Sequence, residues 1–466
     1  MQLYLKNIGA IKDEIEISPG RLTVFSGGNN TGKTYAMYVL WALFQRRARH
    51  VFSFAERLAE QLKTQGGVEL PLHDFFDQHW ATLEKGIADG LRKRLPELFS
   101  APAAAFDAAQ IRVSLDFQEF QAFANSHHEL QRSIVFGTNS TLDVRLTQSP
   151  KGLGIAVTAL EAGKLPNSLL AEIVSSLFID LVLGSQVDNA FLLPAERGGL
   201  NLFYQDLDAK NSALMRHLKR EEANPLELIK ALMVAQYAEP IDAYIQFLKR
   251  APRLPKSGGD LHDQALALQK EITRVRYKVS KDGVITAKPY RSEMELGIHL
   301  TSSTVKSFYG LWAWLELQAK PGDCLMIDEP ELNLHPDNQR LVARLLVRLV
   351  NRGIRVVIST HSDYIVRELN NMIMLSSEFA GREKLEKQFG YDPAGSERLA
   401  YSNIAAYHFT DRRVESCDIS PEFGMEVESM DAAINNLNES NSTIYFALRD
   451  ALHPIEQPEQ VDLFQE

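Results

Sequence analysis

Apolar and polar positions divide the first half of the chain into strand and helix signals. Alternating apolar residues from Leu3 to Ile17 predict a β-hairpin, which leads into a short apolar strand at 22–25. Residues 35 to about 110 carry mainly helical signals, and a further helix is predicted at 167–183. Other strand patterns occur at 111–117, 142–147, 154–158 and 191–193.

The second half begins with a polar helical region from about 203 to 270, which we interpret as an inserted helical arm. Two helices of roughly 25 residues would reach only about 35–40 Å, because an α-helix rises 1.5 Å per residue. Alternation on both sides of Asp282-Gly283 predicts a hairpin. The remaining signals are helices at 305–319 and 338–351 and buried strands at 324–327 and 354–358.

These signals predict an α/β chain in three parts. Residues 1–202 form a first lobe with a helical insert at about 50–110, residues 203–270 form the arm, and residues 271–466 form a second lobe with an acidic tail. The tail alone carries 12 acidic residues and one basic residue from Glu415 onward, so the rest of the chain is near neutral although the net charge is −10. Such a tail is either a solvated surface or an interaction segment.

Composition points to an ordinary globular protein of the cytoplasm. The chain is 45% hydrophobic and 24% charged, and its two cysteines, Cys324 and Cys417, fit a reducing compartment. We expect no signal peptide and no membrane-spanning segment, since the apolar runs at 35–44 and 173–183 are short and predict buried helices.

A glycine-rich segment follows the strand at 22–25 and precedes a helix. It reads GGNNTGKT and fits the phosphate-binding pattern G-x-x-x-x-G-K-[ST]. Its glycines allow backbone N–H groups to face phosphate oxygens, Lys33 would bridge the β- and γ-phosphates, and Thr34 would bind Mg²⁺. The residues expected to bind nucleotide here are Gly27, Gly28, Asn29, Asn30, Thr31, Gly32, Lys33 and Thr34.

Two carboxylates end the buried strand at 324–327. Beside a phosphate-binding loop, Asp328 would hold Mg²⁺ and Glu329 would orient and deprotonate the attacking water. A strand later, His361 follows Ser359-Thr360 and would reach the γ-phosphate. Taken alone, each of these features is better explained as ordinary structure, and the phosphate-binding loop shifts the interpretation to catalysis.

The hydroxyl-rich segment around Ser302 and Ser303 precedes a helix, where it would either cap the helix or bind an anion. Together with the loop, the Asp-Glu pair and the histidine, in this order, it resembles the ABC-type ATPase head, and more closely the RecF/SMC/OLD branch. The stretches IDEPELNLHPDNQ and ISTHSDYIV carry the most specific likeness. The resemblance covers about 1–50 and 271–375 well and the rest only by architecture.

The resemblance implies a mixed central sheet with helices on both faces, an antiparallel β subdomain and a site that binds ATP and Mg²⁺. It implies that Glu331 begins the D-loop, that His361 is the switch histidine, and that Ser302 is the signature serine, which caps the ATP of a second subunit. Such heads form ATP-dependent homodimers, and larger assemblies remain open.

Two features depart from the pattern of this family. Ser303 and Thr304 stand where signature glycines are usual, which predicts slow hydrolysis or a weaker dimer. No glutamine stands at the Q-loop position. There Glu196 could bind Mg²⁺ and Arg197 a phosphate, although a structural turn is the more economical interpretation.

Nothing in the sequence indicates a second enzyme, because no Asp-x-Asp pair or metal-nuclease cluster follows His361. We therefore hypothesise an ATPase that senses a signal and regulates a separately encoded effector, a nuclease. It resembles the ATPase subunits of prokaryotic two-gene antiphage systems of the Septu or PARIS type. The alternative is a RecF-like ATPase that binds DNA during repair or recombination. A transporter subunit fits poorly, since the insertion between Lys33 and Ser302 is too long.

Overall fold

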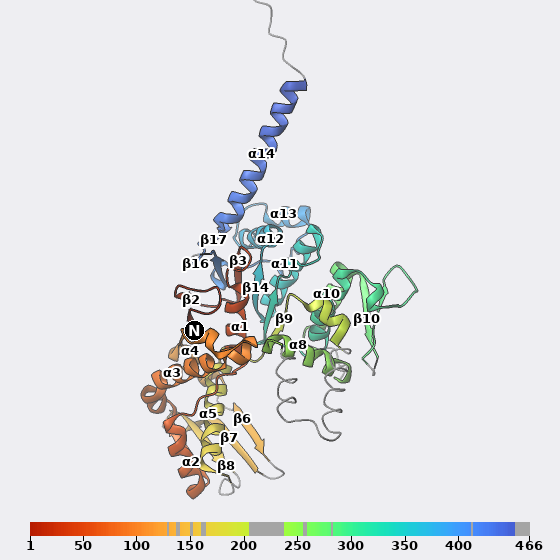
Figure 1. Cartoon of the computed structure of the whole chain (residues 1–466). Coiled ribbons are helices and arrows are strands. Elements are labelled where there is room, and N and C mark those ends of the chain that lie inside the picture. The colour runs from red at the N-terminus through yellow and green to blue at the C-terminus, as the bar shows by residue number, and fades with distance from the viewer. Residues whose placement is uncertain are drawn as a thin grey trace, which may run out of the picture. The chain divides into compact units, whose positions relative to one another are not determined.

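The structure is a computed structural model that describes residues 1–127, 130–136, 140–149, 152–159, 165–204, 237–254, 259–280, 283–411 and 413–452. Within these residues the central sheet has six strands in the order β16-β15-β3-β14-β13-β9 (Figure 1). All neighbours are parallel except β15 and β16. The strands are β3 (Leu22–Gly27), β9 (Ala190–Leu193), β13 (Cys324–Asp328), β14 (Arg355–Thr360), β15 (Ile404–Phe409) and β16 (Val414–Ser416).

The central sheet is covered by helices, and its strands β3, β9 and β13 are buried along their whole length. This explains their continuous apolar runs, because a parallel sheet is buried on both faces. Helix α1 packs against β3, β9, β13 and β14, and α11 packs against β14 and α12. The helices of this region are α1 (Lys33–Phe44), α8 (Glu239–Arg250), α9 (His262–Ala267), α10 (Ser303–Leu317), α11 (Pro336–Asn351), α12 (Asp363–Met374) and α13 (Arg382–Phe389).

Smaller antiparallel sheets accompany the central one in the described residues. The predicted N-terminal hairpin is confirmed, but its second neighbour is β5 and not the strand of the phosphate-binding loop. The sheets are β2-β1-β5, β4-β8-β7-β6, β10-β11-β12 and β17-β18. Their strands are β1 (Gln2–Lys6), β2 (Ile15–Ile17), β4 (Gly67–Pro71), β5 (Gln110–Ser114), β6 (Gln131–Phe136), β7 (Ser140–Ser149), β8 (Gly152–Ala159), β10 (Val275–Val279), β11 (Ile285–Pro289), β12 (Leu296–Gly297), β17 (Ile419–Ser420) and β18 (Gly424–Met425).

Three further helices and several short turns complete this part of the fold, and at one of them the structure differs from the sequence prediction. The strand expected at 111–117 ends at Ser114, because the Asp116 side chain accepts hydrogen bonds from the N–H groups of Gln118 and Glu119 and so starts α4. These helices are α2 (Ser53–Gln65), α3 (Leu72–Phe99) and α4 (Phe117–Ser126). The 3₁₀ turns are η1 (Ala103–Phe106), η3 (Ala251–Arg253), η5 (Ile298–Leu300) and η6 (Tyr401–Asn403), and η4 (Leu268–Thr273) is π-helical.

Among the described residues, one helix is long and apolar enough to cross a membrane, and it is α5 (Asn167–Gly184). The sequence expectation that no segment reaches this length is therefore wrong. The expectation of a buried helix is right, since 61% of the window is buried and α5 packs against α2, β6 and β7.

Residues Met1–Met425 form one compact unit, and Glu426–Glu466 form a second that contains α14 (Glu428–Leu452). Residues 205–236 and 255–258 of the predicted arm lie outside the described residues. Its described part packs on the head, where α9 contacts α10 and α11, and α8 contacts β9 and α3. The division into two lobes and an arm stays a prediction.

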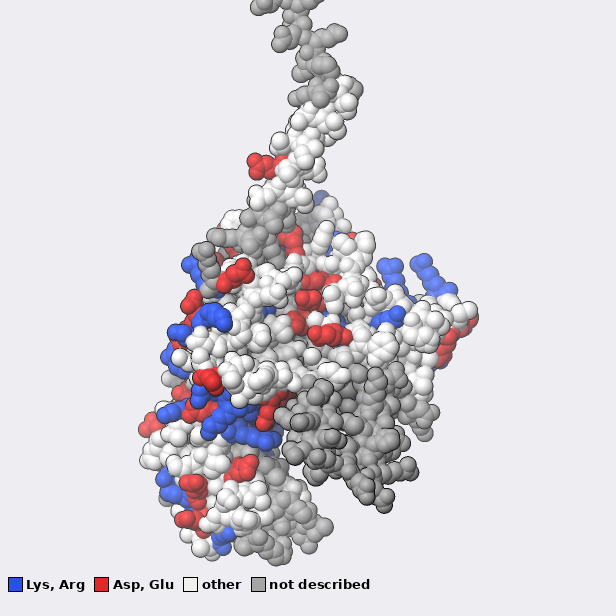
Figure 2. Space-filling model, viewed as in Figure 1, with Lys and Arg blue, Asp and Glu red and all other residues white. Residues whose placement is uncertain are grey.

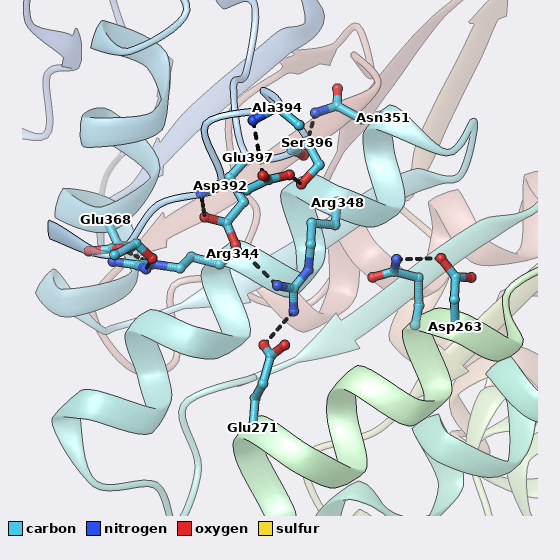
Figure 3. Close-up of polar contacts among 12 residues, drawn as sticks. Asp263, Glu271, Arg344, Arg348, Asn351, Glu368, Asp392, Ala394, Ser396 and Glu397 are labelled. Carbon is cyan, nitrogen blue, oxygen red and sulfur yellow. Dashed lines mark hydrogen bonds and ion pairs between the residues drawn. The ribbon is translucent and has the colours of Figure 1, made fainter. Parts of the chain in front are cut away.

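A buried ionic network holds α11 against the elements next to it (Figure 3). Glu368 on α12 is 2% exposed and accepts hydrogen bonds from Arg340 Nε at 2.7 Å and Arg344 Nε at 2.6 Å. Arg348, one turn further along α11, pairs with Glu271 of η4 at 2.8 Å and with Glu397 at 3.1 Å. The network therefore joins α11 to α12, to η4 and to the loop after α13.

Glu368→Gln is expected to lower the free energy of unfolding by about 3–5 kcal/mol, because it leaves the buried charge of Arg344 without its partner. Denaturant unfolding measures this loss. Glu378→Gln is the matched control, since Glu378 is 88% exposed in its pair with Arg382, and its effect should stay within about 1 kcal/mol. Equal effects of the two changes would contradict the role given to the network.

A second prediction concerns Asp323, which precedes β13 and is 2% exposed. Burial raises the pKa of its carboxyl group from 3.8 to about 6. Between these values the folded protein binds more protons than the unfolded chain, so stability falls as pH rises from about 4 to about 6. Asp323→Asn should remove up to about 3 kcal/mol of this fall, since one pKa unit corresponds to about 1.4 kcal/mol. Thermal unfolding of both proteins across this pH range is the test, and parallel curves would refute it.

Candidate nucleotide-binding site

The predicted site residues come from the carboxyl ends of neighbouring strands. Strand β14 lies between β3 and β13, so the residues that follow these three strands meet at one edge of the sheet. A pocket of about 690 Å³ lies there. It is lined by Ala10, Asn29, Asn30, Thr31, Gly32, Lys33, Thr34, Tyr35, Asp328, Glu329 and His361.

The loop between β3 and α1 has the backbone that its glycines predict. Gly27 has φ 129°, and a Cβ atom there would lie 2.0 Å from the carbonyl oxygen of Phe409 on β15. Gly32, with φ 106°, is the N-cap of α1 and supplies no capping side chain. The first N–H groups of α1 therefore point into the pocket without an intrahelical partner, which is the arrangement that binds phosphate.

Lys33 is folded onto this loop. Its side chain is buried, and its Nζ donates to the carbonyl oxygens of Gly27 at 3.2 Å and Gly28 at 2.6 Å. Burial lowers the pKa of the ammonium group, and the negative charges of Asp328 and Glu329 oppose this shift. The ammonium thus lies between the loop and the carboxylates, where an anion would meet it.

Thr34 and Asp328 are in direct contact. Thr34 Oγ1 donates to Asp328 Oδ2 at 3.1 Å, and Ser359 on β14 donates to the other carboxylate oxygen. A hydroxyl and a carboxylate are the hard oxygen ligands that Mg²⁺ takes beside substrate phosphates, so this pair fits the ion. Among the described residues, no group of three or more His, Cys, Asp or Glu side chains could hold a metal ion by itself.

Glu329 and His361 face each other at the pocket wall. The Glu329 carboxylate is half-buried, and its Oε1 lies 3.8 Å from His361 Nε2. Glu329 has φ 51°, an unusual conformation for a residue with a side chain. Its N–H donates to the carbonyl oxygen of Ser359 at 3.1 Å, which holds this turn against β14. Strain of this kind is concentrated at functional sites.

Glu331 is a third carboxylate near the pocket, and the sequence did not assign it a role in the site. Burial raises the pKa of its carboxyl group, and its Oε1 accepts a hydrogen bond from the His361 N–H at 2.6 Å. Glu331 thereby fixes the end of β14. Burial, followed by the charge of Lys33, lowers the pKa of the His361 imidazole, so the ring is neutral at pH 7.

Arg197 has the structural role that we favoured from the sequence over a phosphate contact. It is 1% exposed, and its guanidinium donates to the carbonyl oxygens of Asp328 at 2.7 Å, Glu329 at 2.7 Å and Pro194 at 3.2 Å. All three acceptors are backbone atoms, so Arg197 braces the turn after β13 and does not face a phosphate. Glu196 is exposed and is not among the residues that line the pocket. Its role at Mg²⁺ stays a prediction.

Ser302 and Ser303 lie outside this pocket. Ser302 is exposed and is the N-cap of α10, where its Oγ accepts from the Val305 N–H at 3.4 Å. The capping interpretation is thus confirmed, and the anion-binding one stays a prediction. Thr304 Oγ1 donates to the carbonyl oxygen of Asn333 at 3.4 Å, which ties the start of α10 to the D-loop of the same chain.

The chain has the mixed α/β fold of a P-loop head. The P-loop, the Asp-Glu strand end and the switch-histidine strand occupy neighbouring strands of one mainly parallel sheet, as this fold requires. A family model described as "AAA domain, putative AbiEii toxin, Type IV TA system" matches residues 206–367. The matched range includes Ser302, Asp328, Glu329 and His361, and the P-loop lies outside it.

Solved structures of SMC heads have a low level of similarity to this chain. One is described as the SmcHead bound to the C-winged helix domain of ScpA, with 11% identity, a TM-score of 0.33, and coverage of 90% of this chain and 97% of that chain. Another is an Smc head domain with an extended coiled coil bound to the C-terminal domain of ScpA, derived from Pyrococcus furiosus, with 11% identity, a TM-score of 0.33, and coverage of 94% and 98%. Likeness at this level carries no conclusion about what this chain binds. No curated protein matches the chain.

Proposed function

We propose that this chain binds and hydrolyses ATP, and that ATP-dependent pairing of two heads regulates a separately encoded effector. The observation that carries the proposal is the pocket that brings Lys33, Thr34, Asp328, Glu329 and His361 together at one sheet edge. A general base, a cation, a metal-binding pair and free helix N–H groups in one pocket suit phosphoryl transfer to water.

Each side chain has a role that its surroundings support. Lys33 leaves the carbonyl oxygens of its own loop and neutralises phosphate oxygens. Thr34 and Asp328 hold Mg²⁺, which when bound offsets negative charge on the phosphates. Glu329 accepts the proton of the attacking water, and neutral His361 next to it orients the reacting groups. Arg197 keeps the Asp328–Glu329 turn in place through the backbone.

Pairing of two copies would complete the site. The exposed hydroxyls of Ser302 and Ser303 lie at the start of α10 and outside the pocket of their own chain. In a head dimer they would close the pocket of the other copy. With Ser303 and Thr304 in place of glycine, backbone approach is less close, so we expect slow turnover that times a switch.

The regulated partner is a proposal that rests on the motifs and the matched family. The matched family is described in terms of a putative toxin of a type IV TA system, which is a setting with more than one component. We therefore propose that the effector is a nuclease encoded separately, that the pair acts in antiphage defence in the cytoplasm, and that the head senses the trigger.

A pull-down of tagged Glu329→Gln protein with ATP and Mg²⁺ tests this function, with mass spectrometry and a nucleic-acid stain as readouts. Lys33→Ala under the same conditions is the control, because it should not hold the nucleotide. A nuclease that co-purifies with Glu329→Gln and not with Lys33→Ala supports the proposal. DNA without a protein partner would instead support a RecF-like role in repair.

A further inference from the structure

Helix α14 (Glu428–Leu452) carries a row of exposed apolar side chains. Every described side chain from 436 to 449 is exposed. Large apolar groups are among them, with exposed fractions of 68% for Leu437, 68% for Ile444 and 56% for Leu448. Figure 2 shows the helix as largely white, with few charged side chains on the visible face. An exposed apolar face of this kind marks an interaction site.

The apolar positions follow the repeat of a coiled coil. Leu437, Asn441, Ile444 and Leu448 are separated by four, three and four residues, which is the a/d spacing of a heptad. In the sequence, the same spacing continues back to Ile434 and Met430 and forward to Ala451.

The composition of α14 indicates that it needs a partner. Between 435 and 443 its sequence is NNLNESNST, in which most residues are poor helix formers. Isolated helices of moderate length are marginal in water even when their sequence favours the helix. The exposed apolar side chains Leu437, Ile444 and Leu448 would therefore stabilise the helix by packing against a partner.

We propose that α14 pairs in parallel with α14 of a second copy of this chain. Asn441 favours a second copy of this chain as the partner and a parallel direction of the two helices. In a parallel pair each a position faces its own equivalent, so Asn441 meets Asn441 of the other copy and the two amides can bond to each other. In an antiparallel pair an a position faces a d position, so Asn441 would lie against Leu437 or Ile444 and stay unpaired, which is costly.

The charges beside the seam and the exposed apolar area of α14 are compatible with a second copy as a weakly bound partner. The positions that flank the seam, Asn438, Ser440, Tyr445 and Ala447, are uncharged, so two copies of this acidic segment meet without like charges along the seam. The large apolar side chains on the described seam, Leu437, Ile444 and Leu448, are 56–68% exposed, and three such side chains offer less area than the about 800 Å² per partner of a standard interface. The pair is therefore weak alone and raises the effective concentration of the two heads.

This inference goes beyond the proposed function, because the pairing of α14 requires no nucleotide. The test uses full-length Lys33→Ala protein without ATP, a state in which the heads are not expected to close. Sedimentation should detect a reversible dimer. Leu437→Ser with Ile444→Ser should raise its dissociation constant by at least about tenfold, whereas Phe446→Ser, off the seam, should leave it unchanged. A monomer at all concentrations, or equal effects of the seam and control changes, would overturn the proposal.

Direction is tested by Leu448→Cys in a Cys417→Ser background, where the remaining Cys324 is buried. In a parallel pair the two introduced thiols lie within disulfide distance, and mild oxidation should yield a covalent dimer. In an antiparallel pair they would be roughly 20 Å apart, given 1.5 Å per residue. Absence of the covalent dimer in a protein that still sediments as a dimer would refute the parallel arrangement. Failure of this test would leave ATP turnover and effector binding unaffected.

Discussion

Glu329→Gln is expected to lower the rate of ATP turnover by about 10²–10⁴-fold and to leave nucleotide affinity nearly unchanged. The amide has the shape of the carboxylate but cannot accept the proton of the attacking water. It also keeps the hydrogen bond from the backbone N–H to Ser359, so the turn after β13 should be preserved. Steady-state phosphate release and equilibrium binding of a fluorescent ATP analogue measure the two quantities.

The matched control for this change is Asp337→Asn, which makes the same conversion at a side chain that is 80% exposed. Its turnover should equal that of the unmodified protein. If Glu329→Gln kept more than a tenth of the normal rate, Glu329 would not be the general base, and water activation would have to be assigned to another group in the pocket.

Arg197→Met is expected to have the second large effect, on stability and turnover together. The apolar side chain fills a similar volume but removes the donor for the carbonyl oxygens of Asp328, Glu329 and Pro194. The Asp328 carbonyl oxygen loses this donor at a cost of about 1–3 kcal/mol, whereas the carbonyl oxygens of Glu329 and Pro194 still accept from the backbone N–H groups of Leu332 and Arg197. Turnover should fall as well, because the backbone that carries Asp328 and Glu329 loses its brace.

Denaturant unfolding and phosphate release are the measurements for Arg197→Met. Arg352→Met serves as the control, since Arg352 is about half exposed in its pair with Asp263. We expect the control to unfold within about 1 kcal/mol of the unmodified protein. An Arg197→Met protein of normal stability and reduced turnover would instead indicate that Arg197 contacts the nucleotide directly.

Four strands of the central sheet, β3, β9, β13 and β14, could be predicted from local apolar runs, whereas β15 and β16 were not predicted individually. β9, β13 and β14 are short apolar runs that end in turn or polar residues, and parallel strands buried on both faces must have this form. β4 could not be predicted in the same way. It lies inside a helical region, and the β-structure of Gly67–Pro71 depends on pairing with β8, about 90 residues later.

The site residues show the same difference between local sequence signals and long-range contacts. Lys33, Thr34, Asp328, Glu329 and His361 were predicted because each lies in a contiguous motif next to a strand or helix end. For Arg197 we favoured a structural turn over a phosphate contact, but nothing local in the sequence reveals that its partners are the backbone carbonyls of Asp328 and Glu329. Glu331 was likewise recognised only as part of a motif, because its contact with the backbone of His361 joins two strands.

The central claim is that ATP brings the signature serine of one copy to the P-loop of another. The most direct measurement crosslinks two separately tagged proteins, one carrying Ser302→Cys and the other Asn29→Cys, both on the Glu329→Gln and Cys417→Ser background. Because each protein carries one of the two cysteines, only an intermolecular bridge joins the tags. The account predicts a mixed product that requires ATP and Mg²⁺. A product of equal yield without ATP, or none with it, would contradict the account.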